Sequence, residues 1–342
     1  MKIVIAGGTG FIGGHLAETL NKRGHEVLLI DVVDGCISDL DFKAKFIKAD
    51  VTTLNDFGSI VKDRGYNVLV YLAGISHTCS AGKMLSENYK NGLYGLSRLL
   101  DQGGKYLDKV LIASSSLISG LLESEMRYYG GYEDEVEANE TWLDTGLSYH
   151  PYVSNKVAME MCVRDWAYLN NKKYIITRFG TTYGPRMRPG VVDDIFIRRA
   201  MKGLPLEIHG DGSQWRQHIY VGETVRGVAI ALEDDGVNSR VFSLVPDYKV
   251  TVKEMAGVVQ SFIPNTKIKY VSGRPLDIKV KYINPYETSK ILGWKNRLTF
   301  NQGMKMTIDW YKKNPDWMPK ELTEDYFTKR CLGEVVGDSE ER

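Results

Sequence analysis

A tyrosine and a lysine four residues apart are the part of this sequence best suited to acid–base chemistry. Pro151 favours the first turn of a helix, so Tyr152 and Lys156 would lie one turn apart on the same helix face. A nearby ammonium lowers the pKa of a phenol by stabilising the phenolate, which makes tyrosine usable as a base near neutral pH. The same spacing is common on exposed helix faces, so a second motif is needed to favour a catalytic interpretation.

The second motif lies at the N-terminus, where three glycines separate a predicted strand from a predicted helix. The apolar run Lys2–Ala6 predicts a buried strand, and residues 11–23 predict the helix that follows. At Gly7, Gly10 and Gly13 the missing Cβ lets the backbone turn tightly, a pyrophosphate approach and the helix pack close to the sheet. The first helical N–H groups and the helix dipole favour that negative charge. The sequence therefore predicts a dinucleotide-binding turn.

Carboxylates at the ends of the next two predicted strands extend this dinucleotide site. Asp31 ends the strand predicted for 26–31, where it can accept hydrogen bonds from both adenosine-ribose hydroxyls and repel a 2′-phosphate. This position favours NAD over NADP, although an aspartate that caps a turn is the alternative. Asp50 and Val51 close the third strand, where the carboxylate could reach the adenine amino group. An ordinary turn residue explains Asp50 nearly as well.

A run of serines follows the predicted strand at 109–114. Ser114, Ser115 and Ser116 come at its carboxyl end, and strand ends at that edge of a parallel sheet line the ligand crevice. Hydroxyls there could hydrogen bond to a substrate oxygen or relay its proton. A serine-rich turn that satisfies its own backbone is the alternative.

Alternating strand-like and helical patterns must position these motifs. Strands are predicted at 26–31, 46–49, 68–73, 109–114, 174–179 and near 241–244, and helices at 11–23, 54–64, 84–102, 152–170, 192–202, 222–233, 252–261 and 301–313. Strands that alternate with helices of this length pair in parallel through crossovers. We therefore expect an α/β fold with a doubly wound parallel (Rossmann) sheet.

The composition changes from Gly184 onward, where proline, arginine and glycine become frequent. We expect an NAD-binding domain over 1–184 with contributions from 216–246, a smaller C-terminal α/β substrate domain from 185–215 and 247–330, and a polar tail over 331–342. The acidic, tyrosine-rich stretch 123–149 is expected to form a long loop near the site.

Composition and charge exclude several other classes of protein. The 342 residues carry a formal net charge of +1, with 43% hydrophobic and 25% charged residues, as in ordinary soluble globular proteins. Basic clusters at 43–48 and at Arg186, Arg188, Arg198 and Arg199 are interpreted as solvated faces or phosphate contacts, not as a nucleic-acid surface. The four cysteines form no CxxC pair, so no metal site is expected. Without a leader or a membrane-length apolar stretch, a cytoplasmic location is expected.

The order of these motifs resembles that of the extended short-chain dehydrogenase/reductases, and within them the nucleotide-sugar epimerases and dehydratases. Further segments that carry the resemblance are Leu72–Gly74, Arg178, Tyr183–Arg186, Phe196–Ala200, Pro205–Leu206, Gly210–Gln214, Ile219–Val221, Gly273–Asp277 and Ser289–Trp294. The resemblance covers the chain up to about Lys313. It implies NAD as the cofactor and a nucleoside-diphosphate sugar as the substrate.

The resemblance also implies a role for each matching residue. Cofactor contacts fall on Gly7, Gly10, Phe11, Ile12, Gly13, Asp31, Asp50, Val51, Leu72, Ala73, Gly74 and Lys156. The catalytic residues would be Tyr152 as the acid/base, Lys156 as its electrostatic partner and Ser115 as the catalytic hydroxyl. Substrate contacts fall on Ser115, Tyr152, Thr181, Arg216 and Arg274, the two arginines binding the diphosphate.

Three positions depart from the family pattern. Dehydratases and decarboxylases of the family usually carry an acid two residues after the catalytic hydroxyl, and here that residue is Leu117. Removing a proton at C5 needs a base, which leucine cannot supply, so dehydration is disfavoured. Thr181 replaces the usual Asn, and Gln217 replaces the usual Asp, which changes the sugar and nucleotide contacts but not the redox core.

We therefore expect an NAD-dependent nucleotide-sugar epimerase that oxidises the substrate transiently at C4. A one-way nucleotide-sugar dehydrogenase or a 4-keto-sugar reductase would use the same serine, tyrosine and lysine. A non-catalytic NAD-binding protein is the alternative from another class, and it would have no need for all three.

The resemblance further implies a homodimer, in which helices around 88–102 and 152–170 pair with their symmetry mates. The apolar residues Leu93, Leu96, Leu99 and Leu100 fit such an interface, and they fit a core-facing helix surface equally well.

Overall fold

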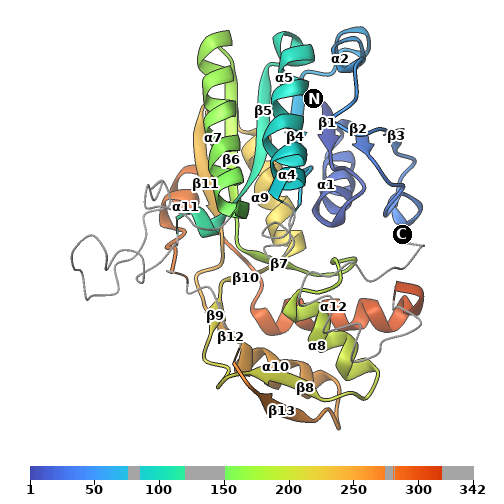
Figure 1. The fold of residues 1–342 in the computed structure, drawn as a ribbon, viewed down its shortest axis with the longest axis vertical. Helices are drawn as coiled ribbons and strands as arrows, with labels where there is room; N and C mark the ends of the chain where they lie inside the picture. The colour runs from blue at the N-terminus through green and yellow to red at the C-terminus, as the bar shows by residue number, and fades with distance from the viewer. Residues whose placement is uncertain (76–84, 120–150, 274–279, 281, 318–342) are drawn as a thin grey trace, which may run out of the picture.

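A parallel sheet of seven strands, in the order β11-β6-β5-β4-β1-β2-β3, organises the computed structural model (Figure 1). The structure describes residues 1–75, 85–119, 151–273, 280 and 282–317. The strands are β1 (Lys2–Ala6), β2 (Glu26–Asp31), β3 (Lys45–Lys48), β4 (Val68–Tyr71), β5 (Lys109–Ser115), β6 (Lys173–Phe179) and β11 (Arg240–Leu244). Every neighbouring pair is parallel. The predicted doubly wound α/β fold is confirmed.

Helices cover both faces of this sheet because its strands alternate between two cores. In β1, Ile3 and Ile5 face one core, and Val4 and Ala6 face the other. The first core is covered by α1 (Phe11–Lys22) and α9 (Val221–Glu233). The second is covered by α2 (Phe57–Arg64), α5 (Gly95–Gly103) and α7 (Pro151–Asn170), with α4 (Leu85–Tyr89) packed beside α7. Short helices η1 (Ile37–Asp39), η3 (Gly104–Tyr106) and η4 (Ser116–Ile118) lie in the connections.

A separate core lies below the carboxyl edge of the sheet in Figure 1. It is built from α8 (Val192–Met201), α10 (Val252–Phe262), α12 (Phe300–Lys313) and the parallel pair β8 (Leu206–His209) and β13 (Ile268–Val271). Two small ladders connect it to the large sheet: β7 (Thr181–Tyr183) with β10 (His218–Tyr220), and β9 (Trp215–Arg216) with β12 (Val250–Thr251). The remaining elements are α11 (Tyr286–Leu292) and η6 (Pro315–Trp317). The division into two domains at the predicted boundaries stays a proposal.

The helix predicted for 84–102 is interrupted by a π-helical turn, η2 (Lys90–Tyr94). The Asn155 side chain of α7 occupies the space beside Gly92, where its Oδ1 accepts from Leu93 N at 3.2 Å and its Nδ2 donates to the Asn88 carbonyl at 2.8 Å. A side chain inserted into a helix ladder is a recognised cause of such a bulge. Residue 84, the loop predicted for 123–149 and the tail 331–342 lie outside the described residues.

Among the described residues, no helix is long and apolar enough to cross a membrane, and no group of three or more His, Cys, Asp or Glu side chains could hold a metal ion.

The four leucines considered for a dimer interface all pack against the second core, and Leu93 is only partly buried there. Leu96, Leu99 and Leu100 are buried in the chain's own core against the sheet. They are therefore core residues, and they do not supply an interface.

Candidate active site

A cleft of about 1210 Å³ opens at the carboxyl edge of the large sheet, between it and the β8–β13 part of the chain. It brings together every predicted site residue that the structure describes. These are Gly7, Gly10, Phe11, Ile12, Gly13, Asp31, Asp50, Val51, Leu72, Ala73, Gly74, Ser115, Tyr152, Lys156, Thr181 and Arg216. Arg274 lies outside the described residues.

The glycine turn between β1 and α1 has the shape that a pyrophosphate needs. Gly7 adopts φ 81°, and a Cβ added there would lie 2.7 Å from Ala73 N. A Cβ on Gly13 would collide with the Gly7 carbonyl, which is why α1 can pack so close to β1 only with glycine there. A Cβ on Gly10 would meet nothing nearer than the Gly7 carbonyl oxygen at 3.4 Å. Gly10 therefore keeps open space at the helix N-terminus, and the turn fits a dinucleotide.

The two predicted strand-end carboxylates differ in how they are held. Asp31 accepts hydrogen bonds from Thr9 N at 3.1 Å and Val32 N at 2.8 Å, which fix it at the end of β2 beside the glycine turn. Asp50 accepts from Thr52 N at 2.7 Å, as a turn residue does, and it also lines the cleft. Asp31 and Asp50 therefore both line the cleft, and their contacts with a ribose and an adenine stay predictions.

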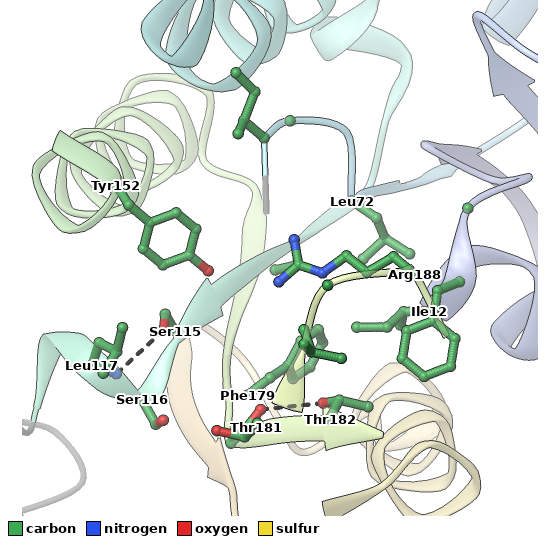
Figure 2. Close-up of a pocket in the computed structure, with 18 of the residues that line it drawn as sticks. Ile12, Leu72, Ser115, Ser116, Leu117, Tyr152, Phe179, Thr181, Thr182 and Arg188 are labelled. Carbon is green, nitrogen blue, oxygen red and sulfur yellow. Dashed lines mark hydrogen bonds between the residues drawn. The ribbon is translucent and has the colours of Figure 1, made fainter. Parts of the chain in front are cut away.

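Ser115 and Tyr152 meet across the cleft from different elements. Ser115 ends β5, Tyr152 lies in the first turn of α7, and the Ser115 hydroxyl acts to lower the pKa of the Tyr152 phenol. Figure 2 shows the Tyr152 hydroxyl directed into the pocket on the side of Ser115. Lys156 follows one turn later, with its Nζ donating to the Ala113 carbonyl at 2.8 Å and lying 5.9 Å from the centre of the Tyr152 ring.

Burial, not the lysine, dominates the acid–base properties of this tyrosine. It raises the pKa of the Tyr152 phenol, and the groups that act against it are the Ser115 hydroxyl and the Arg188 guanidinium. The expectation that Lys156 lowers this pKa stays a prediction. Burial also lowers the pKa of Lys156 to about 8, with the Glu160 carboxylate acting against it.

The arginines after Gly184 were interpreted as a solvated face or as phosphate contacts, and the solvated face is wrong for three of them. Arg186, Arg198 and Arg199 are buried and form ion pairs with Glu18, Asp194 and Glu207 respectively. Arg188 lines the cleft, and its guanidinium projects between Tyr152 and Leu72 (Figure 2). The sequence does contain a signal for the ion pair of Arg198, because Asp194 lies four residues earlier in the same predicted helix. Nothing in the sequence alone predicts that Arg188 lies beside Tyr152.

The three departures from the family pattern have clear structural consequences. Leu117 lies in η4, lines the cleft and donates its backbone N–H to Ser115 Oγ at 3.2 Å. Thr181 begins β7 and pairs in register with His218 at the same cleft wall. The Gln217 amide donates to the carbonyls of Pro246 and Ile283 at 2.6 and 2.9 Å. Gln217 therefore fastens backbone segments together, which is a structural use of that position.

Comparisons with known proteins identify the family. The model of the NAD dependent epimerase/dehydratase family matches residues 3–244. A trifunctional UDP-glucose 4,6-dehydratase/UDP-4-keto-6-deoxy-D-glucose 3,5-epimerase/UDP-4-keto-L-rhamnose-reductase of Arabidopsis thaliana is 25% identical over 328 residues, which cover 92% of this chain and 48% of that protein. The chain spans about half the length of such relatives.

Two other similar proteins match over nearly their whole length. A UDP-glucuronate 4-epimerase of Thermodesulfobacterium geofontis is 24% identical over 328 residues, covering 91% of this chain and 96% of that one. The crystal structure of a UDP-glucose 4-epimerase from Thermotoga maritima with UDP-glucose has a TM-score of 0.81 at 24% identity, covering 92% of this chain and 100% of that one.

The fold and the glycine turn define a Rossmann-type, dinucleotide-binding enzyme of the extended short-chain dehydrogenase/reductases. More particularly, the chain belongs to the NAD dependent epimerase/dehydratase family, and NAD is its cofactor.

Proposed function

We propose that this protein is an NAD-dependent epimerase of a nucleoside-diphosphate sugar that acts by transient oxidation at C4. The observation that carries the proposal is the meeting of Ser115 and Tyr152 in the same cleft as the glycine turn, with Leu117 in place of an acid. Relatives that are UDP-sugar 4-epimerases support the substrate class.

The cofactor fits the residues present. Gly7, Gly10 and Gly13 would hold the pyrophosphate at the N-terminus of α1, and Asp31 would accept from the adenosine ribose. Lys156, buried beside the tyrosine, would donate to the nicotinamide ribose. Bound NAD supplies a hydride acceptor that can return the hydride to either face of a keto sugar.

The chain's own residues would manage the proton and the sugar. Tyr152, as phenolate, would take the proton of the C4 hydroxyl, with Ser115 in the hydrogen-bond path, and would give it back when the carbinol re-forms. Arg216 lines the cleft, and with Arg274 it would hold the diphosphate so that the hexose can turn without leaving.

Leu117 argues against the dehydratase branch of the family. Dehydration removes a proton from C5, so it needs a base near that carbon. Among the described residues, the carboxylates that line the cleft are Asp31, Asp50, Glu87 and Glu207, and none belongs to the loop that carries Ser115.

The experiment incubates the purified protein and NAD with UDP-glucose, UDP-glucuronate and dTDP-glucose in deuterated water. We expect the C4 epimer of one of them, without net NADH and without deuterium on carbon, because the same hydride returns. Stoichiometric NADH, or consumption of added NADH by a 4-keto sugar, would instead indicate the one-way dehydrogenase or reductase. Deuterium at C5 would indicate a dehydratase and contradict the proposal.

The predicted homodimer belongs to this proposal as well. Because Leu96, Leu99 and Leu100 are buried in the core, α5 and α7 would have to contact the second copy of the chain through other residues on their outer faces. Light scattering across a range of protein concentrations tests it, and a constant monomer mass would reject the dimer.

A further inference from the structure

We propose that Glu160 and Arg178, a buried ion pair behind the cleft, are positioning residues that hold Ser115 against Tyr152. The inference rests on the proposed function, because it takes these two hydroxyls to be the reacting groups. Both members of the pair are 0% exposed. A buried pair of this kind adds little net stability compared with apolar residues, so a role in conformational specificity is the better explanation for it.

Glu160 fastens helix α7 to strand β5. It lies one turn after Lys156 on the same face of the helix, and both side chains reach β5. Lys156 Nζ donates to the Ala113 carbonyl at 2.8 Å, and Ser114 Oγ donates to Glu160 Oε1 at 2.6 Å. Two successive residues of the strand are thus fixed to α7 immediately before Ser115.

Arg178 fastens the other end of the serine loop, which we define as Ser114–Ser119. From β6 it donates to both Glu160 oxygens, through Nε at 2.9 Å and Nη2 at 2.8 Å. Its Nη1 donates to Ser119 Oγ at 2.7 Å. The loop is therefore held at its first and last residues by one planar ion pair, with Ser115 between them. Because Tyr152 shares α7 with Glu160, the pair sets the distance between the two reacting hydroxyls.

The pair also sets the charge beside the tyrosine. On α7, Lys156 lies between Tyr152, one turn before it, and Glu160, one turn after it. From other elements, Arg178 of β6 pairs with Glu160, Arg188 acts on Tyr152, and the neighbouring residues Ala113 and Ser114 of β5 are neutral. The Glu160 carboxylate favours the ammonium form of Lys156 against its burial. Loss of this carboxylate would make Lys156 neutral at lower pH.

The test compares Glu160→Gln with the wild type, with Arg164→Gln as a matched control. Arg164 also approaches Glu160, with its Nη2 3.6 Å from Oε2, and its side chain is 33% exposed. Ser114→Ala is the second variant, since it removes one hydrogen bond and leaves the ion pair intact. Each protein is measured for kcat and KM with the accepted nucleotide sugar over a pH series, and for hydrogen exchange of peptides covering the serine loop.

We expect Glu160→Gln to lower kcat by about 10- to 100-fold with KM unchanged, because misplacement of a reacting group acts on the chemical step. The alkaline limb of its pH profile should move down by about one unit. Exchange of the serine loop should accelerate in Glu160→Gln and Ser114→Ala but not in Arg164→Gln.

Wild-type kcat, pH profile and loop exchange in a folded Glu160→Gln protein would overturn the inference. If that variant does not fold, Ser114→Ala decides: unchanged kcat and exchange overturn it, and a loss in both supports it. If the wild type converts no nucleotide sugar, the proposed function fails, and loop exchange still tells whether the pair holds the loop.

Discussion

Gly10→Ala offers a clean test of the dinucleotide site, because the change separates ligand binding from folding. Gly10 has φ −72° and ψ 177°, an extended conformation that alanine adopts freely. The added methyl would lie 3.4 Å from the Gly7 carbonyl oxygen and near no other atom, so it fits the protein. It would stand where the glycine turn faces the cleft, in the space assigned to the pyrophosphate.

The expected effects on folding and binding have opposite signs. Replacing glycine by alanine at a compatible position stabilises a fold by about 0.4–1 kcal/mol through the unfolded chain. The melting temperature without NAD should therefore stay the same or rise slightly. NAD at 100 times its Kd should stabilise the wild type by about 2.7 kcal/mol, and Gly10→Ala should lose that increment. Thermal melts with and without NAD, together with calorimetric titration, measure both quantities.

Gly13→Ala is the matched control because its methyl would collide with the Gly7 carbonyl oxygen. We expect it to destabilise the protein even without NAD. The reasoning would be refuted if Gly10→Ala bound NAD as the wild type does, since the methyl would then lie outside the ligand's path. A large drop in its melting temperature without NAD would refute the claim that this position has free space.

Three further predictions concern the acid–base groups. Tyr152→Phe should lower kcat by about 10²- to 10⁴-fold while NAD still binds, as steady-state rates and titration would show. Arg188→Met removes a cation that lowers the pKa of Tyr152, so the acidic limb of kcat/KM should move to higher pH. Because burial lowers the pKa of Lys156 to about 8, activity that needs its ammonium should fall above that pH. A kcat that does not change up to pH 10 would contradict the role assigned to the Lys156 ammonium.

Most of the fold could be predicted because its signals are local. Strand β2 was predicted with its observed ends, and β5 and β6 to within one residue. Buried parallel strands read as continuous apolar runs, and helices between them have a period that one sequence displays. The glycine turn was equally visible, since its backbone geometry admits few other residues.

The rest of the site depends on contacts between distant segments. The π-turn at 90–94 exists because Asn155, from another helix, fills the space beside Gly92. Likewise, Glu160 looked like an ordinary helix residue until β5 and β6 brought Ser114 and Arg178 to it. Periodicity contains no information about which side chains face each other across a fold.

Burial acts on Tyr152 and Lys156 in opposite directions, and this has a consequence for catalysis. It raises the pKa of the Tyr152 phenol and lowers the pKa of the Lys156 ammonium to about 8, so the ammonium loses its proton at a lower pH than the phenol does. The phenolate is then disfavoured unless more positive charge stands nearby. Arg188 supplies part of it, and the oxidised nicotinamide of NAD would add the rest. In the proposed reaction, Tyr152 would then remove a substrate proton efficiently only when the hydride acceptor is also bound, which would protect the sugar from deprotonation without oxidation.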